Sequence, residues 1–144
     1  MCGAQYHTDN GRLPVPEHFF LLYAVLAARC GGGVSRFRDG RVLKKQLEET
    51  PEGRVAIQLL SETKLPRRIP RAFRQYRGVS PDGYLYAPVL SDEPMWRWRQ
   101  EGIRRGIAAH PECGTPEMRM ALDTLIELLE HGADEIRPVI PPDS

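Results

Sequence analysis

A stretch of basic and aromatic side chains over residues 64–99 is the part of this sequence best suited to chemistry. Arginines are interleaved with aromatic rings there, and the stretch ends in a Trp-Arg-Trp-Arg run. Guanidinium groups bind phosphates while aromatic rings stack on bases, and the same residue types are enriched in protein-binding hot spots. The candidate partner-binding residues are Arg67, Arg68, Arg71, Arg74, Tyr76, Arg77, Trp96, Trp98 and Arg99.

Three interpretations of this stretch stay open. Its arginines could pair with acidic residues of the same chain, contact a partner protein, or contact nucleic acid. Residues 64–105 hold 10 basic and 4 acidic residues, whereas residues 106–144 hold 2 basic and 8 acidic residues. Acidic residues folded nearby would repel phosphate. The sequence therefore favours a protein partner over nucleic acid.

Metal-binding and catalytic patterns are weak in this sequence. His110 and Cys113 are three residues apart, and Cys2 and His7 form a looser pair. Zinc modules usually show two tight ligand pairs, and neither pair here has the C-x2-C form. The sequence also lacks the G-x-S-x-G, H-E-x-x-H and phosphate-loop motifs of common enzyme classes. We predict a protein that is not an enzyme and that uses no metal or other cofactor.

The elements that must position these side chains are mostly helices. An apolar run closed by three glycines predicts a central helix over 16–30. Asp39 is suited to cap a helix that holds Leu43 and Leu47. The letters Thr-Pro-Glu begin a further helix at residue 50 and another at residue 115, because Thr caps, Pro fits the first turn and Glu complements the helix dipole. We interpret this recurrence as shared capping, since no repeat period accompanies it.

The two Thr-Pro-Glu helices carry apolar side chains at helical spacing. In the first, Val55 with Leu59 and Ala56 with Leu60 are pairs four residues apart. The second is predicted over 116–131, with an apolar stripe wide enough to suggest contact with a second copy of the chain. The predicted homodimer seam consists of Met118, Leu122, Leu125 and Leu129.

Helical periodicity disappears between residues 64 and 90. Ser80-Pro81-Asp82-Gly83 predicts a turn, and β-forming residues on both sides predict a small hairpin near 75–87. A further helix is expected from Ser91 or Asp92 to about Ala109. The predicted fold class is therefore mainly α, with four to five helices packed around the central apolar helix 16–30.

Length and composition predict one domain over 1–144, with irregular tails at 1–13 and 138–144. Three widely spaced cysteines make no disulfide framework, and the N-terminal residues show no secretory pattern. The longest apolar run is ten residues, too short to span a bilayer. These features predict a cytoplasmic protein without a membrane partner. Arginines outnumber lysines 17 to 3, which indicates GC-rich coding and a bacterial or phage source.

Taken together, these patterns predict a small non-enzymatic regulatory or inhibitory protein that acts by binding another protein, as bacterial or phage modulators and adaptors do. The alternative is a nucleic-acid-binding protein that uses the arginine and aromatic side chains of residues 64–105.

Overall fold

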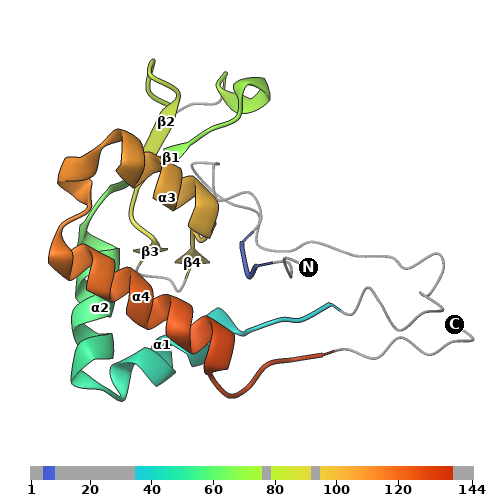
Figure 1. The fold of residues 1–144 in the computed structure, drawn as a ribbon. Helices are drawn as coiled ribbons and strands as arrows, with labels where there is room; N and C mark the ends of the chain where they lie inside the picture. Colours follow the sequence, from blue (N-terminus) through green and yellow to red (C-terminus); the bar gives the residue numbers. More distant parts are fainter. Residues whose placement is uncertain (1–4, 9–34, 76–78, 92–94, 138–144) are drawn as a thin grey trace, which may run out of the picture.

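The part of the chain that the structure describes contains four α-helices and two small antiparallel sheets (Figure 1). The computed structural model describes residues 5–8, 35–75, 79–91 and 95–137. The elements are α1 (Gly40–Glu48), α2 (Pro51–Glu62), β1 (Leu65–Arg68), the 3-10 turn η1 (Arg71–Phe73), β2 (Tyr84–Ala87), β3 (Leu90–Ser91), β4 (Met95–Trp96), α3 (Gln100–Ala109), the 3-10 turn η2 (Pro111–Cys113) and α4 (Pro116–His131). About 52% of these residues are helical and 17% are extended, so the fold is mixed α/β and the mainly α prediction is wrong.

Leucines from different elements form the main core of the described residues. Leu47 of α1, Leu60 of α2, Leu65 of β1 and Leu125 of α4 are fully buried in one cluster. The closest packing between helices joins α2 to α4, which lie side by side in Figure 1. The central helix predicted over 16–30 lies outside the described residues.

Side-chain caps start three of the four described helices, two of them at the Thr-Pro-Glu letters. A carboxylate oxygen of Asp39 accepts a hydrogen bond of 2.8 Å from the backbone N–H of Arg41 at the start of α1. Thr50 caps α2 and Thr115 caps α4, each through its hydroxyl oxygen. The N-cap satisfies a backbone donor that has no partner within the helix. These starts, and the end of α4 at His131, agree with the sequence prediction.

The predicted hairpin has the expected turn but a different partner strand. Gly83 has a φ of 86° and its N–H donates a hydrogen bond of 2.8 Å to the carbonyl of Ser80, as the turn requires. After the turn, β2 pairs antiparallel with β1, and only an isolated bridge joins Val79 to Leu85. The sequence pattern predicted no strand over Leu65–Arg68, and Pro66 lies within β1 because a strand of a two-stranded sheet tolerates proline.

The segment before α3 is extended, so the helix predicted from Ser91 is wrong over its first part. Residues 92–94 are outside the described part, β4 pairs with β3, and α3 begins only at Gln100. Burial alternates through this segment, with Trp96 and Trp98 buried and the residues between and after them more exposed. A period of two is the pattern of a strand, and the Trp-Arg-Trp-Arg run carries it.

Helix α3 covers β1 at short range because of one glycine. A Cβ atom at Gly106 would overlap the carbonyl oxygen of Pro66 in β1. Only glycine lets the helix backbone approach the strand this closely. This contact joins the β1–β2 sheet to the helical part of the molecule.

Candidate functional site

The two tryptophans predicted to bind a partner lie inside the protein. Trp96 is 8% exposed and Trp98 is 5% exposed, and both belong to the main core. The indole N–H of Trp96 donates a hydrogen bond of 2.9 Å to the carbonyl oxygen of Gly40. A buried tryptophan usually needs such a partner, and here it is supplied within the chain. Neither ring is accessible for stacking on a base or for filling a partner's pocket.

Arg67 is also directed inward, although the sequence suggests a surface residue. It is 5% exposed, and its Nη2 donates hydrogen bonds of 3.2 Å to the carbonyl of Pro88 and 2.8 Å to that of Arg97. Its Nε and Nη1 have no partner within the described residues. Burial, with a smaller contribution from the charge of Arg97, lowers the pKa of Arg67 from the usual arginine value to about 10. Arg67 therefore links the loops that hold Pro88 and Arg97, and its buried guanidinium cannot bind a phosphate at the surface.

The remaining arginines of this stretch do not form one surface with the tryptophans. Arg74 is half-buried, and its Nε donates a hydrogen bond of 3.0 Å to the carbonyl of Ile69. Tyr76 and Arg77 lie outside the described residues. The candidate residues that are exposed are Arg68, Arg71 and Arg99.

The predicted homodimer seam is largely occupied by the protein's own core. Met118, Leu125 and Leu129 are buried, and Leu122 is partly buried against the same cluster. The apolar stripe of α4 packs chiefly on α2, with a smaller contact to α1. Its width is therefore explained by two neighbours within one chain, and these four side chains offer little surface to a second copy.

His110 lies in a small polar cluster between the end of α3 and the turn before β2. Its Nε2 is 3.1 Å from the hydroxyl of Tyr86 and 3.7 Å from Asp82, and its Nδ1 is 3.5 Å from Glu112. Cys113 is close in sequence, and burial raises the pKa of its thiol. No group of three or more potential ligands suited to a metal ion occurs within residues 5–8, 35–75, 79–91 and 95–137.

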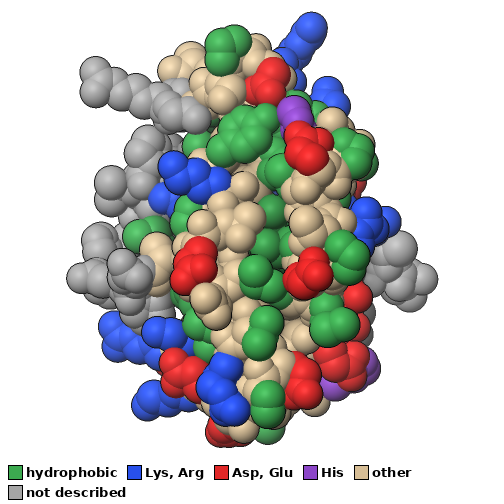
Figure 2. All heavy atoms as spheres, turned by 90° about the vertical axis from the view of Figure 1, so that its left-hand side faces the viewer, with side chains coloured by type: hydrophobic (Ala, Val, Ile, Leu, Met, Phe, Trp, Pro, Cys, Tyr) green, Lys and Arg blue, Asp and Glu red, His purple; other side chains and the backbone are tan. Residues whose placement is uncertain are grey.

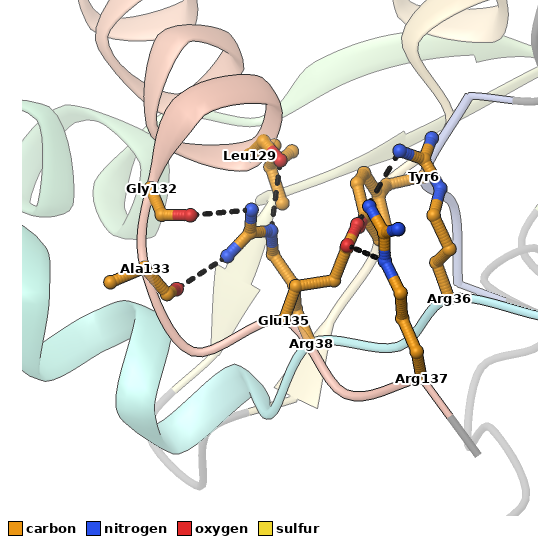
Figure 3. Close-up of polar contacts among 8 residues, drawn as sticks. All are labelled: Tyr6, Arg36, Arg38, Leu129, Gly132, Ala133, Glu135 and Arg137. Atoms are coloured by element: carbon orange, nitrogen blue, oxygen red, sulfur yellow. Dashed lines mark hydrogen bonds and ion pairs between the residues drawn. The ribbon is translucent and has the colours of Figure 1, made fainter. Parts of the chain in front are cut away.

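Arg38 fastens the chain before α1 to the end of α4 (Figure 3). Its guanidinium donates hydrogen bonds of 2.8 Å to the carbonyls of Leu129 and Gly132 and 2.6 Å to that of Ala133. Carbonyls in the last turn of a helix have no partner within the helix, and a cation there also complements the helix dipole. The three bonds are a capping arrangement, which leaves Arg38 little capacity for a ligand.

A second polar cluster surrounds Glu135 beside this cap (Figure 3). Glu135 accepts a short hydrogen bond from the hydroxyl of Tyr6 and one of 2.5 Å from Nε of Arg137. It also forms an ion pair with Arg36, at 3.4 Å. The hydrogen bond from Tyr6, followed by that from Arg137, lowers the pKa of Glu135 below its usual 4.5. A nearby pocket of about 260 Å³ includes Tyr6 and Arg36 in its lining. Both side chains are already engaged by Glu135, and the other polar residues of the lining are Gln5, Gln100 and Glu130.

A second pocket is an apolar groove between α2 and α4. It has a volume of about 330 Å³. Val55 from α2 and Met120 from α4 contribute to it and are 57% and 65% exposed. The full lining is Pro51, Glu52, Val55, Ala56, Pro116, Glu117, Met120, Ala121 and Thr124. Figure 2 shows this face, with hydrophobic side chains down the middle and acidic side chains to either side.

The groove is built from two copies of one short sequence. Residues 50–56 read TPEGRVA and residues 115–121 read TPEMRMA, identical at five of seven positions. We call these two segments the paired motif. Each copy supplies its second, third, sixth and seventh residue to the groove. The recurrence is therefore longer than the three capping letters, and an alignment of the two segments would have revealed it.

The two copies of the paired motif occupy matching environments. From residue 50 to 62 and from 115 to 127, every aligned position has the same burial class in both helices. Thr50 accepts a hydrogen bond of 3.0 Å from the N–H of Gly53, and Thr115 accepts one of 3.2 Å from the N–H of Met118. The same residue types at the same spacing thus build the same helix start twice, on the two sides of one groove.

Comparison with known proteins gives no match: no family model, no curated protein and no solved structure is similar to this chain. Within the described residues, each helix is too short or too polar to cross a bilayer. The geometry of the described surface is therefore the basis for an assignment of function.

Proposed function

We propose that this chain is a small non-enzymatic regulatory protein that binds a partner protein through the groove between α2 and α4. The observation that carries the proposal is the exposure of Val55 and Met120, at 57% and 65%, in an apolar groove. Apolar side chains that are exposed within one groove, unlike ones scattered singly over a surface, are typical of interaction sites. The occupant that fits is an amphipathic helix with cationic residues beside its apolar face, which is a common mode of helix-in-groove recognition.

The negative charge of α2 and α4 favours a cationic helix as the occupant of the groove. Together α2 and α4 hold six acidic residues and two arginines, and all eight are exposed. The acidic residues are Glu52, Glu62, Glu117, Asp123, Glu127 and Glu130. A cationic helix would meet a complementary field, which speeds association and excludes wrong partners.

The same charges disfavour the other occupants. A second copy of the chain would place one acidic face against another, and like charges across an interface cost affinity. Nucleic acid would meet a negative field at this groove. The arginine and aromatic stretch is a weaker candidate for nucleic acid than its sequence suggests, because Trp96 and Trp98 are buried and cannot stack on bases.

A titration with a synthetic amphipathic helix tests the proposal. The probe is a fluorescein-labelled helical peptide with one leucine to enter the groove and lysines on either side of that leucine along the same helix face. Binding is followed by fluorescence anisotropy. We expect saturable binding that Val55→Asp and Met120→Asp each weaken about tenfold or more, because each places a charge in an apolar contact. Ile136→Asp is the matched control, since Ile136 is 54% exposed but does not line the groove.

Two results would overturn the proposal. One is the absence of saturable peptide binding, and the other is binding that Met120→Asp leaves unchanged. A parallel titration with labelled duplex and single-stranded oligonucleotides at low and moderate salt tests the alternative. Salt-steep binding that Arg71→Ala weakens would assign the protein to nucleic acid instead.

A further inference from the structure

We infer that the groove recognises one bulky apolar side chain between two cations, with one cation for each copy of the paired motif. This rests on the proposed function, because it concerns the occupant of the same groove. It adds the charge pattern of the partner and gives the two copies equal parts in recognition.

The lining of the groove is the first support. Pro51, Glu52 and Val55 come from one copy, and the same positions of the other copy supply their counterparts. The two alanines at the seventh position, Ala56 and Ala121, are buried and also belong to the lining. The groove volume of about 330 Å³ is enough for one large apolar side chain. Each copy then contributes half of the surface around it.

The placement of the two glutamates is the second support. Glu52 and Glu117 both stand at the second residue of a helix that starts with a threonine cap and a proline. Their backbones are therefore held in the same way relative to the groove. Neither carboxylate has an ion-pair partner within the residues that the structure describes. Both remain available to a cation that approaches from solvent.

The arginines of the paired motif are the third support, because they turn away from these glutamates. Arg54 donates a hydrogen bond of 2.9 Å to the carbonyl of Glu48, and Arg119 donates one of 2.9 Å to the carbonyl of Gly114. Each guanidinium is thus bound to the backbone just before its own helix. In both copies of the paired motif, the arginine is therefore bound to the chain's own backbone and the glutamate lines the groove.

This arrangement defines a pattern for the partner helix. Residues three or four apart lie on the same face of a helix. A large apolar residue in the groove would therefore be flanked, three or four residues before and after it, by lysine or arginine. A partner with a cation on one side alone would engage only one copy of the paired motif.

The test combines changes in the protein with changes in the peptide. The reference peptide carries one leucine with a lysine four residues before it and another four residues after it. We expect Glu52→Gln and Glu117→Gln each to weaken binding by about two- to fivefold and by the same factor, the size of an exposed ion pair. Replacing either lysine of the peptide with glutamine should have the same effect, without any change to the protein. The matched controls are Glu62→Gln and Glu127→Gln, aligned glutamates that do not line the groove.

The outcomes separate this inference from the proposed function. Equal losses for the two groove glutamates, with little change for the two controls, would support the two-cation pattern. If Met120→Asp abolishes binding but only one glutamate or one lysine matters, the proposed function stands and this inference is wrong. If the controls weaken binding as much as the groove glutamates, the cations are attracted by the overall field and the inference is also wrong. If the peptide does not bind, both are overturned.

Discussion

In the segment 64–99 the largest aromatic side chains face inward, whereas in the paired-motif helices two apolar side chains of ordinary type face solvent. Trp98 is 5% exposed, while Met120 is 65% exposed. The segment is rich in residues typical of binding hot spots, and the helices are not. The difference shows that residue type indicates interaction only after burial is known.

The two regions differ because the polar groups of one find hydrogen-bond partners within the chain, whereas the helices of the other pack along one face only. The extended segment places Trp96 and Arg67 against backbone carbonyls that need donors, so their polar ends are used internally. Helices α2 and α4 bury one face against each other, and Val55 and Met120 on the adjacent face are exposed. A helix that packs along one stripe retains side chains on its other faces for a partner.

The largest expected effect tests whether the two paired-motif helices are equivalent in the core. Leu60→Ala and Leu125→Ala should each lower the free energy of unfolding by about 2–5 kcal/mol, because both leucines are fully buried at aligned positions. Val55→Ala, at an exposed position of the same helix, should change it by less than about 0.5 kcal/mol. Urea unfolding measures all three, and a loss below about 1 kcal/mol at one leucine would break the equivalence.

The next prediction concerns the one buried position at which the two copies differ most, Gly53 in α2 and Met118 in α4. A Cβ atom at Gly53 would overlap the carbonyl oxygen of Leu47, so Gly53→Ala should destabilise the protein by about 1–3 kcal/mol. Gly102→Ala in α3 should instead stabilise it by up to about 1 kcal/mol, because the nearest atom to its Cβ is 3.9 Å away. Thermal unfolding of the two variants should give opposite shifts in Tm, and shifts of the same sign would contradict the close contact before α2.

Substitutions of Arg67 and Arg68 test whether side chains of the segment 64–99 are used inside the protein. Arg67→Ala should lower the free energy of unfolding by about 1–3 kcal/mol, since two partly buried carbonyls lose their donor. Arg68→Ala, at the exposed neighbour, should have an effect below about 0.5 kcal/mol. Arg67→Met should cost less than Arg67→Ala, because it keeps the volume and removes a buried charge.

The pH dependence of these arginine variants follows from the pKa of Arg67. Its pKa of about 10 in the folded state is below that of an arginine in the unfolded chain, so the unfolded chain binds more protons in the window above about pH 10. Stability therefore rises with pH through this window in the wild-type protein. Arg67→Met should lack that rise while Arg68→Ala keeps it, and unfolding measured above pH 10 compares them. An identical rise in both variants would mean that Arg67 is not the titrating group.

Local sequence signals were sufficient for the starts of three described helices and for one turn, but not for the start of α3, which has no side-chain cap. Asp39, Thr50 and Thr115 mark helix starts through interactions within a few residues, and Gly83 marks a turn for the same reason. The partner of β2 depends on residues about twenty positions away in sequence. Pro66 argues locally against a strand there, whereas the pairing with β2 and the packing of α3 on β1 favour one.

The groove between α2 and α4 could not be predicted from the sequence, because it too depends on contacts between distant residues. Val55 with Leu59 and Ala56 with Leu60 are equally good apolar pairs on a helix, and the sequence does not say which pair faces the core. The position of α4 decides this, by burying Ala56 and leaving Val55 exposed. The repetition of the paired motif was readable in the sequence, but its meaning required knowing that the two copies lie together.

The smallest expected effect sharpens the comparison at the helix starts. Thr50→Ala and Thr115→Ala should each cost about 1 kcal/mol, because each removes the acceptor of one backbone N–H at a helix N-terminus. Serine at either position keeps a hydroxyl acceptor and should restore most of the loss. Native-state hydrogen exchange makes the test local: the amide of Gly53 should lose protection in Thr50→Ala, and that of Met118 in Thr115→Ala. Because the two caps make the same hydrogen bond, the two losses should agree within about 0.5 kcal/mol. A cap that matters at α4 and not at α2 would mean that tertiary contacts, and not the shared letters, hold the two sides of the groove in place.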